Sequence, residues 1–391
     1  MNKNHRGNRT VLISGGSVAG PALAYWLHRH GFTPTIVERA PELRDGGYAV
    51  DFRGEALDVL DRMGLLAEIR ALDTEMDDAA MVDAEGRQYA TLPAVIFAGD
   101  LEVLKGDLTR KLYEATRQDV EYVFGDSIAT LEQDADGVLV TFEHGAPPRR
   151  FDLVVGADGL HSRTRALAFG PEEEFVRHLG IYTGIFNLDN YLGLRNTGRL
   201  YAAPGKAANI FTARDNTEAR AAFHFAADNL EYDRRDPAAQ KRIIADRFAT
   251  DGWEVPRLLE EMEAATEFFF DSNAQVEMDT WSAGRVVLLG DAGYCAGPTS
   301  GRGTSQALIG AYLLAGELAA RGGDHTAAFA AYEHQMRPYV AEHQALGREG
   351  AERFFMPAPT QEILDTLAAN APENVRTEPV RLRDYTPSAA A

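Results

Sequence analysis

The chain has one cysteine, Cys295, among its 391 residues. A single thiol excludes an intrachain disulfide framework and any metal site built from several cysteines, so we expect no metal. The sequence also has no apolar run as long as a membrane span, and its first residues, MNKNHRGNR, have no apolar signal-peptide core. These absences predict a cytoplasmic protein that works away from membranes.

Positive charge is scarce as well. The chain has 39 Lys and Arg against 59 Asp and Glu, a formal net charge of −20. This balance argues against a nucleic-acid surface, although a solvated acidic surface explains it without a cationic substrate. A hydrophobic content of 45% and a charged content of 25% are ordinary for a soluble globular protein. The length allows two domains.

What the sequence does have is an ordered pattern near its start. An apolar run over 11–14 ends in the turn GGSVAG at 15–20, and apolar residues then recur at helical spacing over 22–27. A second apolar run at 35–37 closes on Glu38. Strand, glycine turn, helix, strand and acid follow one another at the spacing of a dinucleotide-binding βαβ unit.

Each residue type in that unit has a physical task. Gly15 permits the tight turn, Gly20 lets the helix pack close to the strand, and free N–H groups at the helix start face a pyrophosphate. Glu38 can accept hydrogen bonds from a ribose diol. Ser17 stands where the fingerprint usually has its middle glycine. The predicted cofactor contacts here are Gly15, Ser17, Val18, Ala19, Gly20, Glu38 and Arg39.

Two later stretches carry similar chemistry. In DLVVGADGLHSR, residues 152–163, a buried strand runs into a turn at Asp158, a pattern that a plain strand–turn–helix also explains. In WSAGRVVLLGDA, residues 281–292, a strand delivers Asp291 at its C-terminal end, where open α/β sheets bind ligands. The glycines at 301 and 303 then open a helix whose N–H groups can hold an electron-rich ring edge. This arrangement suggests a second contact to the same large cofactor.

The middle of the chain, 177–270, has a different character. Short strand-like runs alternate with turns and aromatic residues are frequent, which predicts a mostly antiparallel sheet forming one wall of a pocket. A strand-like pattern is also expected over 79–97, with a turn at 84–86. Towards the C-terminus we expect a helical region over about 326–353, interrupted at Pro338.

In this order, GGSVAG with Glu38, VVGADGLHSRTR and RVVLLGDAGYCAGPTSGRG resemble the class A FAD-dependent monooxygenases, the hydroxybenzoate-hydroxylase-like flavoproteins. The smaller tetracycline-modifying members are similar in length. The resemblance covers about residues 9–345. It implies an α/β fold in which a Rossmann-like FAD-binding βαβ domain is interleaved with a mostly antiparallel β-sheet substrate domain, followed by C-terminal helices. The implied boundaries are 9–78, 100–170 and 278–345 for the discontinuous FAD-binding domain, 79–99 and 171–277 for the substrate domain, and 346–391 for a C-terminal helix and tail.

The resemblance also implies roles for single residues. Glu38 would bind the adenosine ribose of FAD, Asp158 would serve both FAD and NAD(P)H docking, and Asp291 would hold ribityl or ribose hydroxyls. Gly15, Ser17 and Gly20 would surround the pyrophosphate, and Pro298, Gly301, Gly303 and Thr304 would lie along the isoalloxazine. Lys105 stands where the family has an arginine, and lacks its forked donor set. The chain departs further at Gly293-Tyr294 (family Ala-His), Ser305 (Asn) and Gly310 (Asp).

The implied reaction is NAD(P)H-dependent hydroxylation through a flavin C4a-hydroperoxide. An aromatic or polyketide-like small molecule would be the substrate and O2 the oxidant, as in antibiotic biosynthesis or modification. Two alternatives remain open: a flavin-dependent reductase or oxidase without oxygen transfer, and a non-catalytic flavin-binding protein. No catalytic acid or base is assigned, because the central histidines His161, His178 and His224 are isolated in the sequence. We expect a monomer or a homodimer.

Overall fold

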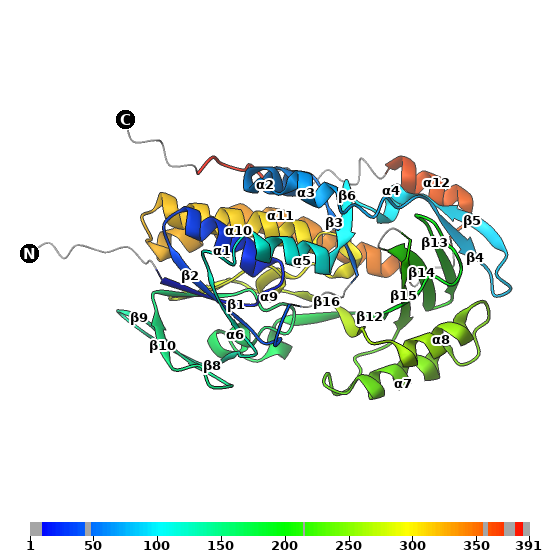
Figure 1. Cartoon of the computed structure of the whole chain (residues 1–391), viewed down its shortest axis with the longest axis horizontal. Coiled ribbons are helices and arrows are strands. Elements are labelled where there is room, and N and C mark those ends of the chain that lie inside the picture. The colour runs from blue at the N-terminus through cyan, green and yellow to red at the C-terminus, as the bar shows by residue number, and fades with distance from the viewer. Residues whose placement is uncertain (1–9, 44–47, 214–215, 355–358, 371–379, 386–391) are drawn as a thin grey trace, which may run out of the picture.

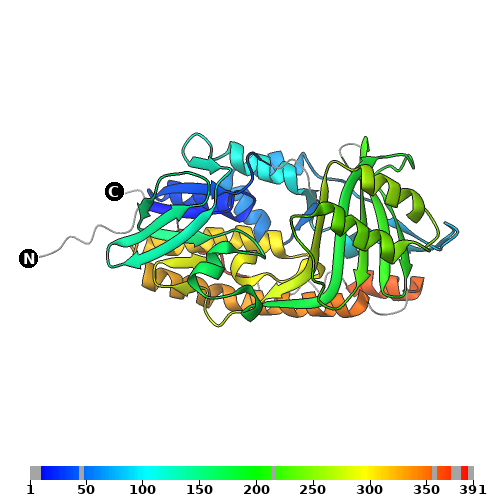
Figure 2. The ribbon, with the colours of Figure 1, turned by 90° about the horizontal axis from the view of Figure 1, so that it is seen from below.

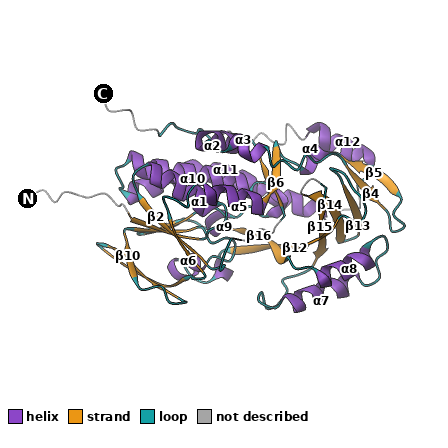
Figure 3. Ribbon diagram, in the orientation of Figure 1, coloured by secondary structure: helices purple, strands orange, loops and turns teal. Residues whose placement is uncertain are grey.

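The computed structural model of the chain describes residues 10–43, 48–213, 216–354, 359–370 and 380–385. The molecule is elongated, with a parallel sheet and its helices at one end and an antiparallel sheet at the other (Figure 1). Figure 3 shows these two groups of strands and the long helices that run between them. In the described part of the chain, no helix is both long and apolar enough to cross a membrane. The predicted α/β class is confirmed.

The six-stranded sheet has the order β17-β18-β11-β1-β2-β7, and all its neighbours pair in parallel except β17 with β18. Side chains alternate along β1, so Val11 and Ile13 face the core with helices α1 and α10, while Leu12 faces the opposite core. Both faces are covered, which explains why the strands read as continuous apolar runs. The strands are β1 (Thr10–Ser14), β2 (Thr33–Glu38), β7 (Glu121–Phe124), β11 (Leu153–Gly156), β17 (Ser282–Ala283) and β18 (Val286–Leu288).

Helices cover one face of this sheet and a small antiparallel sheet covers the other. The small sheet comprises β8 (Ile128–Asp134), β9 (Gly137–Phe142) and β10 (Arg149–Phe151). On the helical side, α10 packs along α1 and α11 packs along α10. The helices of this part are α1 (Ala19–Arg29), α2 (Glu55–Met63), α3 (Leu66–Arg70), α5 (Lys105–Glu114), α6 (Arg163–Ala168), α9 (Asp291–Tyr294), α10 (Gly303–Ala320) and α11 (His325–Phe354).

The seven-stranded sheet has the order β16-β12-β15-β14-β13-β4-β5 and is antiparallel apart from the β13–β4 pair. One face packs on α7 (Pro237–Phe248) and α8 (Val255–Ala264), through Phe186, Phe223 and Phe248 among others. Figure 2 shows the two helices crossing these strands. The strands are β4 (Ala79–Val82), β5 (Gln88–Leu92), β12 (Val176–Asp189), β13 (Gly198–Ala203), β14 (Lys206–Ala213), β15 (Glu218–Ala226) and β16 (Phe268–Val276).

A two-stranded antiparallel sheet of β3 (Ala49–Phe52) and β6 (Leu101–Leu104) lies between the two large sheets. Short helical elements complete the chain: α4 (Ala94–Phe97), α12 (Gln361–Asn370), η1 (Glu172–Glu174) and η2 (Pro298–Ser300). α12 packs on β5 and α4, where Leu364 is buried with Met81 and Ala90.

Three sequence expectations need correction. Residues 94–97 form the short helix α4 after Pro93 rather than a strand, because proline is well placed just before or at a helix start. The helix α8, inside the stretch expected to hold strands, escaped prediction although Pro256 occupies its first turn. α11 also continues through Pro338, since packing on α10 and η2 holds both halves of the helix. β4 and β5 do join the sheet built from 176–276, but the domain boundaries stay a prediction.

Candidate cofactor and substrate site

The glycine turn after β1 can hold only glycine at two positions. Gly15 has φ +112°, and a Cβ there would come within 2.3 Å of the Ala157 carbonyl oxygen. A Cβ on Gly20 would come within 1.9 Å of the Gly15 carbonyl oxygen. These contacts bring the start of α1 against the ends of β1 and β11. They leave the N–H groups of the first helical turn free to face an anionic group.

Glu38 ends β2 beside this turn. Its Oε2 accepts a hydrogen bond of 2.7 Å from the Gly16 N–H, and its Oε1 accepts one of 2.8 Å from the Ala40 N–H. Each carboxylate oxygen retains a second lone pair, so Glu38 can still accept from a ribose diol. Arg39 is exposed next to it. The positions of Gly15, Gly20 and Glu38 therefore suit the adenosine diphosphate half of a dinucleotide.

Asp158 follows β11, and its backbone lies next to Gly15. Its carboxylate accepts hydrogen bonds from the hydroxyls of Ser162 (2.5 Å), Thr164 (2.9 Å) and Ser14 (3.2 Å), and from the Thr164 N–H (2.9 Å). Four donors within the chain already hold this side chain. Its geometry thus makes Asp158 the group that ties the β11–α6 turn to the end of β1.

Asp291 lies at the other end of the candidate site. Its side chain is exposed, yet desolvation by the surrounding chain raises the pKa of its carboxyl despite the opposing charge of Lys105. The carboxylate is therefore open to solvent although the surrounding chain partly desolvates it. Its Oδ1 is 3.6 Å from where a Cβ on Gly303 would be, so Asp291 also borders the start of α10. Lys105, at the start of α5, packs its ammonium against the Tyr48 ring.

The predicted ring-edge loop follows Asp291. Gly301 adopts the left-handed conformation, with φ +60°, and ends the short turn η2 that begins at Pro298. Gly303 and Thr304 then open α10, and both are half-buried. In the part of the chain that the structure describes, the buried amide of Gln306, one turn further on, has no hydrogen-bond partner for either of its polar atoms.

These residues form one continuous line across the C-terminal ends of the parallel strands. Glu38 contacts Gly16, Gly20 contacts Gly15, and a Cβ on Gly290 would lie 3.5 Å from Ala19, one residue from Asp291. Asp291 in turn borders Gly303. The two glycine contacts, the Asp291 carboxylate and the unpartnered amide fit an extended dinucleotide such as FAD. Of the predicted cofactor contacts, Gly15, Gly20, Glu38, Asp291 and Gly303 define this line, and Arg39 is exposed at its end.

The three family departures at the second half of the site have local explanations. A Cβ on Gly310 would come within 2.3 Å of the Tyr294 hydroxyl, so the tyrosine occupies the space of a larger side chain. Tyr294 also accepts a hydrogen bond of 2.7 Å from the Tyr332 hydroxyl. Ser305 accepts a hydrogen bond of 3.2 Å from the Arg53 N–H. The loop and α10 are therefore fixed to β3 and α11 by contacts of this chain's own.

The face of the seven-stranded sheet opposite α7 and α8 forms the second wall. It includes Thr183 and Ile185 of β12 and their cross-strand neighbours His224 and Phe269. Phe269 is exposed, and its ring lies 5.6 Å from that of Tyr48. His224 Nδ1 is 2.9 Å from the Thr183 hydroxyl, and burial lowers the pKa of His224 to about 4. This wall combines the apolar Ile185 and Phe269 with a neutral hydrogen-bonding pair, and Asp271 lies directly opposite Thr183 on the same face.

Sequence reasoning missed the charge cluster around His161. The imidazole lies 3.0 Å from both Glu172 and Asp271, and Arg234 donates a hydrogen bond of 2.7 Å to Glu172. Burial lowers the pKa of His161, but the two carboxylates outweigh it and the net pKa is raised. Nothing local in the sequence pairs residues 161, 172 and 271. The sheet alone brings Asp271 there.

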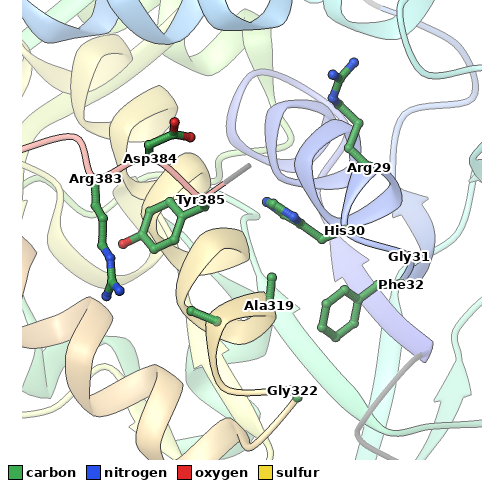
Figure 4. A pocket seen from close by; sticks show the side chains of 11 residues that line it. Arg29, His30, Gly31, Phe32, Ala319, Gly322, Arg383, Asp384 and Tyr385 are labelled. Atoms are coloured by element: carbon green, nitrogen blue, oxygen red, sulfur yellow. The ribbon is translucent and has the colours of Figure 1, made fainter. Parts of the chain in front are cut away.

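A cavity of about 620 Å³ lies elsewhere in the molecule. Figure 4 shows its lining, which includes Arg29, His30, Ala319 and Tyr385. Arg29, His30 and Ala319 stand at the C-terminal ends of α1 and α10, whereas the candidate site lies at the N-terminal ends of the same helices. This cavity is therefore not part of the candidate site.

Comparison with known proteins adds to this geometry. A family model described as an FAD binding domain matches residues 8–345. An uncharacterized protein of Mycobacterium tuberculosis is 49% identical over 86% of this chain and 92% of its own length. A flavin-dependent monooxygenase of Legionella longbeachae is 38% identical over 89% of this chain and 90% of its own length.

The fold has a solved counterpart as well. The crystal structure of the tetracycline destructase Tet(55) superposes with a TM-score of 0.87 at 38% identity, and the match covers 98% of this chain and 100% of the other. The resemblance predicted from the three motifs is thereby confirmed. The chain belongs to the FAD-dependent monooxygenase family, the class A flavoproteins, and is an FAD-binding oxidoreductase.

Proposed function

We propose that the protein is an NAD(P)H-consuming monooxygenase that hydroxylates an aromatic or polyketide-like small molecule. The observation that carries this proposal is the pairing of two surfaces. One is the line of glycine contacts and carboxylates from Glu38 to Gly303, and the other is the sheet face that carries Ile185, Phe269 and the neutral pair Thr183–His224. The tetracycline substrate named for the structural relatives supports the polyketide-like class.

The residues of the line would divide the cofactor between them. Gly15, Ser17, Val18, Ala19 and Gly20 would surround the pyrophosphate, with Glu38 and Arg39 at the adenosine end. Lys105 would contact a phosphate, Asp158 would fix the turn beside the pyrophosphate, and Asp291 would accept from ribityl or ribose hydroxyls. Pro298, Gly301, Gly303 and Thr304 would line the ring. Bound FAD would supply reduction by NAD(P)H and transfer of one oxygen atom from O2.

The sheet face would hold the substrate. Ile185 and Phe269 offer apolar contact to a planar ring system, and exclude water from its surface. His224 is neutral at physiological pH because burial lowers its pKa to about 4. With Thr183 on one ring nitrogen, it can present the other to a hydroxyl or carbonyl of the substrate.

FAD binding is tested first. Asp291→Ala should lose most of the bound FAD after gel filtration, because it removes a hydrogen-bond acceptor of the site. Asp279→Ala, at an exposed position outside the line, should keep it. Equal flavin content in the two variants would overturn the role of Asp291. A wild-type protein that holds no FAD at all would overturn the whole proposal.

Oxygen transfer is tested on the FAD-loaded protein with isotope-labelled O2 and a panel of aromatic polyketides that includes a tetracycline. A product that carries one labelled oxygen atom, with NAD(P)H consumed in proportion, is the expected result. Complete conversion of O2 to hydrogen peroxide with every compound would identify an oxidase instead. NAD(P)H-dependent change of a compound without O2 would identify a reductase.

A further inference from the structure

Two carboxylates face each other in the two-stranded sheet between the large sheets. Asp51 of β3 and Glu102 of β6 are directly opposite in the antiparallel register. Residues in such a pair extend to the same face of the sheet with their Cβ atoms about 5 Å apart. Their neighbours Val50, Phe52, Leu101 and Val103 are buried in the helical core. The pairing of β3 with β6 therefore places one acid against another at an otherwise apolar junction.

Both acids are withdrawn from solvent. Glu102 is 8% exposed, and its Oε1 accepts a hydrogen bond of 2.6 Å from the Thr74 hydroxyl. The Asp51 side chain is 13% exposed, and its Oδ2 lies 3.4 Å from Arg53 Nη2. Like-charged carboxylates at close range cannot both ionise cheaply in such surroundings. One long contact to Arg53 does not neutralise two charges.

The pair also borders the candidate ring-edge loop. A Cβ on Gly301 would lie 3.4 Å from Asp51 Oδ2, and Arg53 N–H bonds Ser305 in the first turn of α10. Arg302, between these two contacts, is 7% exposed, and its Nε has no hydrogen-bond partner in the described residues. A buried guanidinium with an unpartnered Nε beside a buried acid makes this junction sensitive to a change of charge.

The charged groups around the pair determine how it titrates. Burial raises the pKa of Asp51 to about 6, against the opposing charges of Arg53 and Arg302. Burial raises the pKa of Glu102 to about 7; the charges of Asp51 and Asp73 raise it too, while the Thr74 hydrogen bond and Arg53 oppose the shift. Asp100 lies close enough to affect Arg302 in turn. The two acids therefore titrate together near neutral pH.

We propose that Asp51 and Glu102 share one proton, and that the pair takes up a proton from solvent when the neighbouring flavin site gains negative charge. The second part rests on the proposed function. Hydride transfer from NAD(P)H brings two electrons and one proton to the site, and so adds one negative charge. A carboxylate of the pair then binds one proton, and the charge balances. Asp51 is the member nearest the loop, and Glu102 acts through it.

The shared proton is tested on flavin-free protein by infrared difference spectroscopy across pH. Wild type should show a protonated-carboxyl band that disappears between about pH 5 and pH 8, well above the ordinary range of acids. Asp51→Asn and Glu102→Gln each leave one buried acid, whose band should disappear at a lower pH than in wild type because no neighbouring carboxylate opposes its ionisation. Asp58→Asn, at an exposed carboxylate of α2, should keep the wild-type titration. A band that titrates at the wild-type pH in both pair variants, or never appears, overturns the shared proton.

A third variant distinguishes a change in the acid pair from a loss of folding. Thr74→Val keeps both acids but removes the hydroxyl that donates to Glu102. The pH at which the carboxyl band disappears should therefore be higher than in wild type. The hydrogen bond stabilises the charged form, and its loss favours the protonated one. An unmoved titration in folded Thr74→Val would contradict the assignment to Glu102.

Coupling to the flavin is tested by the pH dependence of the reduction potential of the FAD-loaded protein. Wild type should take up two protons per two electrons near pH 7, and the pair variants only one. Identical slopes overturn the coupling even where the infrared band is present. A protein that binds no FAD fails the proposed function and the coupling together, while the infrared titration still decides the shared proton.

Discussion

The hydroxyl of Tyr294 occupies the space that a side chain on Gly310 would need, within 2.3 Å of its Cβ position. Tyr294 is fully buried and accepts a hydrogen bond from Tyr332, whose hydroxyl also lies 3.3 Å from the Leu288 carbonyl oxygen. Two departures from the family pattern that look independent in the sequence are thus one packing arrangement. The Tyr294 ring on α9 can occupy this space only because Gly310 on α10 has no side chain.

Gly310→Ala should therefore destabilise the protein by about 1–3 kcal/mol, because the added methyl overpacks a closed interface. In the double variant with Tyr294→Phe the clashing oxygen is gone, and most of this loss should be recovered. Urea denaturation of the two single variants and the double variant measures the coupling. Strictly additive effects would contradict the direct contact.

This pair shows what sequence reasoning could reach. The βαβ unit, Glu38 and Asp291 were predictable because each depends on local spacing: a turn that only glycine allows, and an acid at a strand end. The fit between Tyr294 and Gly310, the facing of Asp51 and Glu102, and the His161 cluster depend on packing or strand register across many residues. The sequence did contain one signal for the acid pair. Glu102 interrupts the apolar run 101–104, and a charged residue in a run expected to be buried indicates a special role.

Gly20→Ala tests the close packing of α1 on β1. The methyl would come within 1.9 Å of the Gly15 carbonyl oxygen, and neither backbone segment can move without opening the turn. We expect loss of bound FAD together with destabilisation of at least about 3 kcal/mol. FAD content after gel filtration and the denaturation midpoint report the two effects.

The matched control is Gly64→Ala at the end of α2. Gly64 has φ +76° with open space around its Cβ position, so the substitution should cost only about 1 kcal/mol of backbone strain. FAD content should stay at the wild-type level. Wild-type flavin content in Gly20→Ala would refute the close approach of α1 to β1.

The His161 cluster predicts a pH-dependent stability. Because the net pKa of His161 is raised, its stabilising contribution is fully present below its ordinary pKa of about 6.5 and is lost as pH rises through the raised pKa. Burial raises the pKa of Glu172, but hydrogen bonds from His161 and Arg234 outweigh it and lower the pKa to about 2. The contribution of Glu172 is therefore present above its ordinary pKa of about 4.5 and is lost as pH falls towards 2.

His161→Gln should lower the free energy of unfolding by on the order of 1–2 kcal/mol at pH 6, and by less at pH 9, because the wild-type imidazole loses its charge as pH rises through its raised pKa. Urea denaturation at the two pH values measures the difference. His334→Gln replaces an exposed histidine and should leave stability unchanged at both. A His161→Gln loss that is equal at the two pH values would show that packing rather than charge is responsible.

The contacts of Tyr385 predict that the C-terminal segment stabilises α10. Its ring packs directly over Gly316, where a Cβ would come within 2.2 Å of it, and its hydroxyl donates a hydrogen bond of 2.5 Å to the buried Glu317. Tyr385→Phe should cost about 1 kcal/mol through the lost hydrogen bond. Tyr385→Ala should cost about 3 kcal/mol, since it also empties the space over Gly316. Tyr89→Phe, at an exposed ring, is the control.

Because α10 begins at the ring-edge loop, Tyr385→Ala should also weaken FAD retention. Full FAD retention in a destabilised Tyr385→Ala variant would show that the C-terminal end of α10 does not support the loop.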